Sequence, residues 1–323
     1  MTPPLPLVLD TDPGIDDTLA LLLALASPEL DVRAVVTVYG NTTLAHATAN
    51  ARRIAAWAGR GDLAVVAGAD RPLLRTLVTA RETHGPRGLG WASADAVSEG
   101  AVTPDPFALL EVLRTQPAPV TLVTLGPLTN LAHALRREPE TVRARVAAHV
   151  AMAGSLRARG TQTPLAEFNV WCDPDAAQLV LDAELGTRWV GLDVTRLVTL
   201  AARDVEALDR TPRDRWLRDA LRFYCEFHRA YESFDGCVVN DPVPIALLLE
   251  PDLVDFDDVG LAVDLRDGAT RGQTRLDPRG RTARAATAID ANTVRELLFR
   301  RVFGAGPDVP PPDPAPPTLR SPA

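Results

Sequence analysis

The sequence predicts an α/β fold: a mostly parallel, Rossmann-like open sheet flanked by helices, with extra helices and a small hairpin in the C-terminal third. Short apolar, β-branched segments alternate with segments of helical pattern up to about residue 200. The 323 residues are 46% hydrophobic and 24% charged, a balance typical of a globular protein with a large core. Moreover, the first apolar segment runs through a Pro13-Gly14 turn into an apolar helix, as in a strand–turn–helix unit.

The alternating region supplies most of the expected elements. The expected strands are 5–10, 32–38, 63–67, 120–125, 146–152 and 188–193. The expected helices are 17–26, 44–58, 106–115, 128–135 and 174–183. This order favours parallel strands joined by helical crossovers.

The C-terminal third has a different character. Long helices are expected at 213–232 and 241–249, and a last helix at 292–302. Segments 259–265 and 270–276 are typical of a hairpin around Asp267-Gly268. Residues 307–323 hold eight of the 28 prolines, which predicts a disordered tail after a catalytic domain at 1–306.

Composition and charge exclude several classes of function. The net charge of −8 disfavours a nucleic-acid partner, and no apolar run is long enough to span a bilayer. Without a signal-peptide pattern, the expected location is cytoplasmic. The cysteines Cys172, Cys225 and Cys237 form no CxxC pair, so buried thiols are expected. The absence of lysine excludes Schiff-base lysine chemistry and a P-loop.

The most informative feature is a cluster of four acids at the first strand-to-helix corner: Asp10, Asp12, Asp16 and Asp17. Helix capping would explain one of them, because aspartate is favoured at a helix N-terminus. Capping does not explain all four, since their charges repel one another. A hard divalent cation would remove that repulsion, and strand ends are where open α/β sheets bind ligands. The corner therefore predicts a metal site.

Further polar clusters follow other expected strands or precede helices. Each is weak alone, because turns and helix starts favour the same residue types. A Glu167/Asn169 pair around Phe168 could also hold sugar hydroxyls. The clusters are 39–42, 83–90, 125–130, 166–174 and 239–242.

Taken together, these motifs resemble one family. Residues 10–17, Asp-Thr-Asp-Pro-Gly-Ile-Asp-Asp, look like the opening signature of the inosine–uridine-preferring nucleoside hydrolases. The resemblance continues in family order through 40–42, 84–90, 125–130, 152–154, 167–169 and 241–242. It implies Ca²⁺-dependent hydrolysis of the N-glycosidic bond of ribonucleosides, giving free base and ribose through an oxocarbenium-like transition state.

The resemblance also implies roles for individual residues. The Ca²⁺ ligands would be the carboxylates of Asp12, Asp17 and Asp241 and the backbone carbonyl of Leu125. Asp16 would be the general base that deprotonates a Ca²⁺-bound water. The ribose pocket would be formed by Asn41, Met152, Glu167 and Asn169, with Phe168 beside the sugar.

Two positions depart from the family pattern. Asn240 stands where many members have a histidine proposed to protonate the leaving base, and Thr161 where an asparagine often contacts the 5′-hydroxyl. Tyr224, His228 and Tyr231 share one face of a predicted helix at the nucleobase end.

Our hypothesis is that His228 replaces the missing acid, with Tyr231 and Asn240 beside the base. The alternative is a stripe of core or interface residues. His84 is a second candidate for contact with the base.

Other interpretations remain open at this point. The chain could be a catalytically weak paralogue that binds Ca²⁺ and ribosides, because Asn240 cannot act as an acid. A haloacid-dehalogenase-like phosphatase is a remote alternative. Such enzymes generally need a downstream basic residue, most often lysine, which this chain lacks, and this interpretation leaves Asp16 and Asp17 without a role. The expected assembly is a homodimer or homotetramer, as the family is usually one or the other. The preferred base is not predicted.

Overall fold

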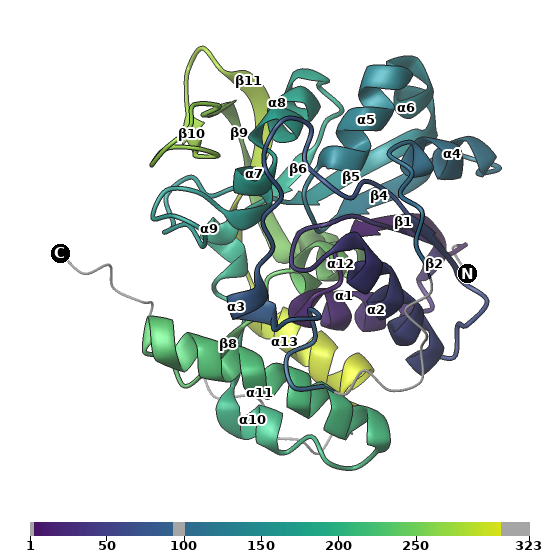
Figure 1. The fold of residues 1–323 in the computed structure, drawn as a ribbon, viewed down its shortest axis with the longest axis vertical. Coiled ribbons are helices and arrows are strands. Elements are labelled where there is room, and N and C mark those ends of the chain that lie inside the picture. Colours follow the sequence, from purple (N-terminus) through teal and green to yellow (C-terminus); the bar gives the residue numbers. More distant parts are fainter. Residues whose placement is uncertain (1–2, 93–100, 305–323) are drawn as a thin grey trace.

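The computed structural model describes residues 3–92 and 101–304 (Figure 1). Within these ranges nine strands form one sheet, in the order β10-β9-β11-β6-β5-β4-β1-β2-β3. From β3 to β11 neighbouring strands are parallel, whereas β9 is antiparallel to both β10 and β11. The strands are β1 (Leu5–Thr11), β2 (Leu30–Thr37), β3 (Ala64–Ala67), β4 (Val120–Thr124), β5 (Val146–Met152), β6 (Arg188–Val190), β9 (Val254–Val263), β10 (Thr274–Leu276) and β11 (Arg281–Ile289). This arrangement confirms the predicted fold class.

Helices cover both faces of the sheet. Those of the first half are α1 (Ile15–Leu25), α2 (Leu44–Trp57), α3 (Arg81–His84), α4 (Ala108–Thr115), α5 (Thr129–Arg137), α6 (Pro139–Arg145), α7 (Phe168–Cys172) and α8 (Pro174–Asp182). Those of the second half are α9 (Leu192–Thr195), α10 (Ala202–Glu206), α11 (Pro212–Glu232), α12 (Pro242–Leu249) and α13 (Ala291–Leu297). A 3₁₀ turn (Pro251–Leu253), a π turn (Leu298–Val302) and the antiparallel pair β7 (Thr199–Ala201) and β8 (Gly236–Val238) complete the described elements.

The alternation of side chains along β1 divides the core into two layers. Leu7 and Leu9 point to the face covered by α1, α2 and α12, while Val8 points to the face covered by α4 and α5. Figure 1 shows these two groups of helices on opposite sides of the sheet. All three side chains are fully buried, so the central strand is apolar on both faces, as is typical of a parallel sheet.

The chain reverses its winding direction between β1 and β4. β1 lies between β2, which follows it in the sequence, and β4, which comes much later. Such a switch point opens a crevice beyond the carboxyl ends of the two strands, and open α/β sheets bind ligands there. The corner 12–17 lies at this crevice because it connects the end of β1 to α1.

The expected strands are all present, with some differences in their bounds. The strand expected at 188–193 ends at Val190, because Gly191 is followed by the short helix α9. The expected hairpin is formed by β9 and β10, with Val263 opposite Thr274, but its second strand is shorter.

Other elements were not expected at all. β11 was missed because it consists mainly of alanine, arginine and threonine, which give almost no apolar signal. The last helix changes to a π turn at Leu298.

The predicted tail at 307–323 lies outside the described residues, so the division of the chain at 306 stays a prediction. The three cysteines are buried and unpaired, as expected. Over the two described ranges, none of the helices is both long and apolar enough to cross a membrane.

Candidate functional site

A cavity of about 440 Å³ lies at the carboxyl edge of the sheet, beside the switch point. Segments that are far apart in the sequence form its wall, and most of the predicted site residues are among them. Its lining includes Asp16, Asn41, His84, Leu125, Met152, Thr161, Glu167, Phe168, Asn169, Asn240 and Asp241. The remaining lining residues are 78–83, Gln162, Leu192 and Tyr224.

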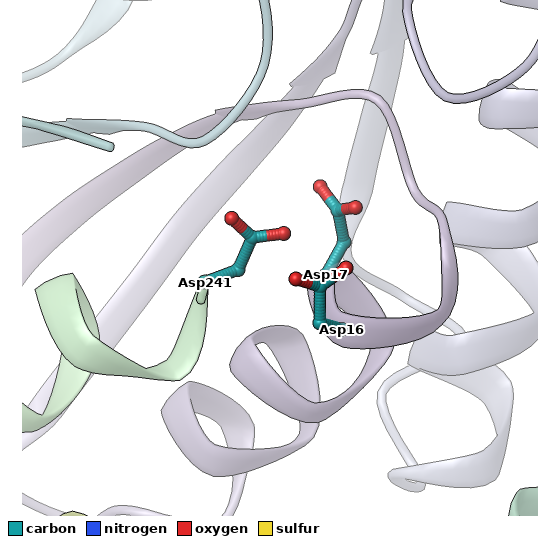
Figure 2. A group of neighbouring side chains, drawn as sticks. All are labelled: Asp16, Asp17 and Asp241. Carbon is teal, nitrogen blue, oxygen red and sulfur yellow. The ribbon is translucent and has the colours of Figure 1, made fainter. Parts of the chain in front are cut away.

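Three carboxylates lie close together at this cavity (Figure 2), and two of them, those of Asp16 and Asp241, line it. Asp16 and Asp17 come from the first turn of α1, and Asp241 precedes α12. One carboxylate oxygen from each lies within 4.8 Å of the other two, and all three side chains are buried. Burial is the main cause that raises the pKa of each carboxyl above its ordinary value, and neighbouring negative charges raise that of Asp17 and Asp241 further. A nearby positive charge would therefore stabilise the ionised form of these three carboxylates.

Asp12 lies next to this group without belonging to it. Its Oδ2 accepts a 2.6 Å hydrogen bond from the backbone N–H of Asn41, whereas its buried Oδ1 has no partner among the described residues. Two glycines make room for this carboxylate: a β-carbon would lie 2.0 Å from Oδ2 at Gly40 and 2.6 Å from Oδ1 at Gly126. Its charge also raises the pKa of Asp241, so the two carboxylates act on one another.

Asp17 and Asp10 differ in their hydrogen-bond partners. Asp17 accepts from the Thr11 hydroxyl at 2.5 Å, the Gly14 N–H at 2.9 Å and the Asn41 side chain at 2.8 Å. The bond from Gly14 caps α1. Helix capping therefore accounts for only one of the three hydrogen bonds that Asp17 accepts. Asp10 accepts from Asn130 at 2.8 Å, and burial raises its pKa to about 7.

The donor set fits a hard divalent cation. The available donors are all oxygen atoms: the carboxylates of Asp16, Asp17 and Asp241, and the buried Oδ1 of Asp12, which has no hydrogen-bond partner among the described residues. The carbonyl of Leu125 borders the same cavity and accepts one hydrogen bond, 2.7 Å from the side chain of Asn169. A second lone pair of this carbonyl is available for a cation.

Glu167 and Asn169 are fixed by hydrogen bonds rather than solvated in a loop. Glu167 accepts from the backbone N–H groups of Asn169 at 2.6 Å, Gly154 at 3.1 Å and Val170 at 3.0 Å. It thereby caps α7. The side chain of Asn169 donates to the carbonyls of Leu125 and Met152. Both side chains are thus preorganised at the wall of the cavity.

His84 is the one histidine among the residues that line this cavity. Its Nδ1 lies 3.1 Å from the backbone N of Ile15, and because an amide can only donate, Nδ1 accepts. The proton of the neutral ring is therefore on Nε2. Burial lowers the pKa of His84 to about 4, although the charge of Asp17 acts in the opposite direction. The ring centroid lies 5.2 Å from that of Tyr224.

The structure does not bring His228 and Tyr231 into the cavity. Nδ1–H of the buried His228 donates to the carbonyl of Tyr224 at 2.8 Å, and its Nε2 accepts from the N–H of Val238 at 3.4 Å. Tyr231 is 68% exposed and its ring packs on Phe227. Of the predicted aromatic face, only Tyr224 lines the cavity. Helical periodicity identifies a shared face correctly, but it does not indicate how far along the helix the cavity extends.

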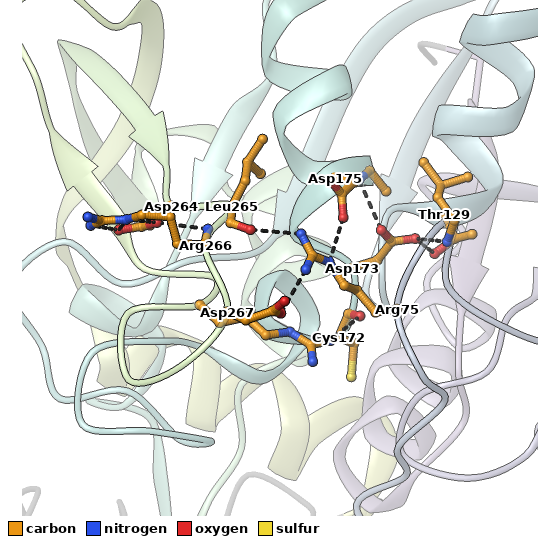
Figure 3. A network of polar contacts seen from close by, with 12 residues as sticks. Arg75, Thr129, Cys172, Asp173, Asp175, Asp264, Leu265, Arg266 and Asp267 are labelled. Carbon is orange, nitrogen blue, oxygen red and sulfur yellow. Dashed lines mark hydrogen bonds and ion pairs between the residues drawn. The ribbon is translucent and has the colours of Figure 1, made fainter.

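One wall of the cavity is the strap formed by residues 73–84, of which the sequence motifs identified only the end, at Thr83 and His84. Figure 3 shows how Arg75 anchors it. The guanidinium of Arg75 donates to Asp175 at 2.8 Å, to Asp267 at 2.7 Å and to the carbonyl of Leu265 at 2.7 Å. These partners belong to α8 and to the connection between β9 and β10. The partners of Arg75 lie 100 or more residues away along the chain, so no local signal predicts this anchor.

Comparisons with known proteins agree with this geometry. The family model described as inosine-uridine preferring nucleoside hydrolase matches residues 7–296. The pyrimidine-specific ribonucleoside hydrolase RihA of Citrobacter koseri is 38% identical over 280 residues, covering 84% of this chain and 88% of the relative. The RihA of Salmonella gallinarum is 36% identical over 310 residues, covering 92% and 98%.

Solved structures of nucleoside hydrolases have the same fold as this chain. A plant nucleoside hydrolase superposes with a TM-score of 0.85 at 30% identity, covering 94% of this chain and 100% of that one. A purine-preferring ribonucleoside hydrolase from Gardnerella vaginalis superposes with a TM-score of 0.83 at 26% identity, covering 93% and 98%.

Proposed function

Because the chain belongs to the inosine–uridine-preferring nucleoside hydrolase family, and is therefore a hydrolase that acts on N-glycosyl bonds, we propose that it cleaves ribonucleosides to free base and ribose with the aid of Ca²⁺. The observation that carries this proposal is the group of buried carboxylates at the cavity. Folding alone would not favour these charges, so a ligand is needed to account for them.

The proposed Ca²⁺ ligands are the carboxylates of Asp12, Asp17 and Asp241 and the carbonyl of Leu125. When bound, such a cation lowers the pKa of a water molecule and orients it together with the sugar hydroxyls. The orphaned oxygen of Asp12 and the contacts among the other carboxylates support this set.

Asp16 is the proposed general base. Its carboxylate lines the cavity, and its Oδ2 accepts hydrogen bonds from Asn240. In the reaction it takes a proton from the attacking water while positive charge develops on the ribose ring. The neighbouring carboxylates stabilise that charge.

The ribose would lie against residues on either side of the carboxylates. Asn41 and Asn169 present side-chain amide groups held by hydrogen bonds, and Met152 and Phe168 present apolar surface. Glu167 and Thr161 extend this wall. Because these side chains are already fixed, little conformational entropy is lost on binding.

At the nucleobase end we place His84 ahead of His228 as the donor to the leaving base. His84 borders the cavity and carries its proton on Nε2, whereas both ring nitrogens of His228 are engaged within the fold. A role of His228 in packing α11 against β8 is supported by these two bonds. Assembly as a homodimer or homotetramer stays a prediction.

The test is release of base and ribose from a panel of purine and pyrimidine ribonucleosides, with and without a chelator. We expect hydrolysis that the chelator abolishes and added Ca²⁺ restores. Pyrimidine ribonucleosides come first in the panel, because the curated relatives are named as pyrimidine-specific. Undiminished activity in chelator would contradict the role of the cation. Ca²⁺ binding without any turnover would favour the riboside-binding paralogue, and hydrolysis of phosphate monoesters instead would favour the phosphatase.

A further inference from the structure

Asn240, one of the two positions that depart from the family pattern, lies at the centre of a short hydrogen-bonded chain. Its backbone N–H donates to Oδ2 of Asp16 at 3.1 Å, and its side-chain amide reaches the same oxygen at 3.4 Å. On its other side, the hydroxyl of Thr195 donates to Oδ1 of Asn240 at 2.9 Å. The order of the chain is therefore Thr195, Asn240, Asp16.

The carboxylate of Asp16, which can only accept, sets which way the amide of Asn240 faces, and the hydroxyl of Thr195 holds the amide in that orientation by donating to its Oδ1. An amide has a donor end and an acceptor end, and a flipped Asn240 would turn its oxygen toward the carboxylate of Asp16. Two oxygens facing one another would repel. With Oδ1 held by the hydroxyl, the NH₂ group is directed at Asp16 instead.

Thr195 is well placed for this task. It is the last residue of α9 and is fully buried, so its hydroxyl cannot turn to bulk water. Its backbone N–H bonds to the carbonyl of Gly191, which fixes the residue in the turn that follows β6. Thr195 itself does not line the cavity, so it can act on the reaction only through Asn240.

We infer that Thr195 is a positioning residue for the hydrolysis: through Asn240 it holds the carboxylate of Asp16 in the orientation that accepts the proton. This inference rests on the proposed function. A general base needs a fixed position within hydrogen-bond reach of its proton, and a carboxylate held by two donors has that. Asn240 is in this chain a neutral clamp on the base, not a defective acid.

The test compares two substitutions that differ in the hydroxyl. Thr195→Val keeps the shape and loses the donor, whereas Thr195→Ser keeps the donor and loses a methyl group. We expect Thr195→Val to lower kcat about tenfold or more with little change in KM, the usual scale for a partner of an active-site group. Thr195→Ser should restore kcat to within about threefold of the wild type. A residue that only packed would not follow the hydroxyl in this way.

A double-mutant cycle that combines Thr195→Val with Asn240→Ala tests whether Thr195 acts through Asn240. If Thr195 acts through Asn240, adding Thr195→Val to Asn240→Ala should lower kcat no further. The matched control is Thr187→Val. Thr187 is another buried threonine, bonded to Nδ1 of His149 at 2.8 Å, and it lies at the amino end of β6, away from the cavity. Its kcat should equal that of the wild type.

Several outcomes would overturn the inference. An unchanged kcat in Thr195→Val, a Thr195→Ser variant as slow as Thr195→Val, or multiplicative effects in the cycle would each do so. If Thr195→Val does not fold, as judged by thermal denaturation, Thr195→Ala makes the same comparison with a smaller side chain. A wild-type protein that hydrolyses no nucleoside would overturn the proposed function and this inference together. An active wild type with an unaffected Thr195→Val would overturn this inference alone.

Discussion

Two adjacent aspartates at the start of α1 have different surroundings. Asp17 accepts hydrogen bonds from Thr11, Gly14 and Asn41, so both of its oxygens are held in place. Asp16 faces the cavity, and Asn240 supplies its side-chain hydrogen bonds. These environments suit a fixed ligand at Asp17 and a proton acceptor at Asp16.

We predict that Asp16→Asn and Asp17→Asn separate these roles. Asp16→Asn should still bind Ca²⁺ in calorimetric titration, while kcat falls at least a hundredfold because the base is lost. Asp17→Asn should lose both Ca²⁺ binding and activity, because the cation loses a carboxylate ligand. The assignment of roles would be wrong if Asp16→Asn lost the metal while Asp17→Asn retained it.

At the residue scale, the sequence identified the candidate site residues that stand in short motifs. It missed the residue whose proposed role depends on a contact formed only in the folded structure. Asp12, Asp16, Asp17 and Asp241 stand in short motifs, and the structure places all four at one corner. Thr195 has no motif, because a hydroxyl that orients an amide 45 residues away leaves no local pattern.

Among the elements, the strap 73–84 is held to the rest of the fold by a few long-range hydrogen bonds, of which Arg75 makes three. Arg75 ties it to α8 and to the β9–β10 connection, and the side chain of Arg75 is only 16% exposed. A second anchor is the N–H of Leu73, which donates to Asp173 at 2.8 Å. Residues 78–84 of the strap form part of the cavity wall.

We predict that Arg75→Ala loosens this wall. KM for the nucleoside should rise several-fold, because the strap must be ordered again when substrate binds, and the melting temperature should fall. Arg71→Ala is the matched control, since Arg71 is exposed and its ion pair is with its neighbour Asp70. Surface pairs of that kind contribute about 0–1 kcal/mol. Equal KM values for the two variants would show that the anchor does not shape the site.

Element existence was predictable where periodicity is strong, and not where tertiary contacts decide. The helix at Pro212–Glu232 was expected to within one residue, because it is long and its helical pattern is clear. β11 and α9 were missed, since one is a charged strand held by its neighbours and the other a single turn.

On the scale of the whole molecule, sheet order creates the site. The sequence predicted parallel strands, but not that β4 lies beside β1. That neighbour relation brings Leu125 next to the corner 12–17, while α12 packs against α1 and brings Asp241. The carboxylate cluster proposed to bind the cation is therefore a property of the assembled sheet and forms only on folding.

We predict that Ca²⁺ stabilises the folded protein. A ligand that binds only the native state adds about 2.7 kcal/mol at a concentration one hundred times its Kd, so the melting temperature should rise with Ca²⁺ and fall with a chelator. The expected cause is relief of repulsion among Asp16, Asp17 and Asp241. Asp17→Asn should lose most of this response. A wild-type melting temperature independent of Ca²⁺ would contradict a cation in the cluster.

The two glycines beside Asp12 have a consequence for reading related sequences. At Gly40 and Gly126 even a methyl group would occupy the volume of the Asp12 carboxylate. A homologue with alanine at either position could retain all four aspartates and still have Asp12, the first of the proposed ligands, displaced. Loss of the metal during evolution would then be recorded at residues that carry no charge, and a search limited to the acidic motif would overlook it.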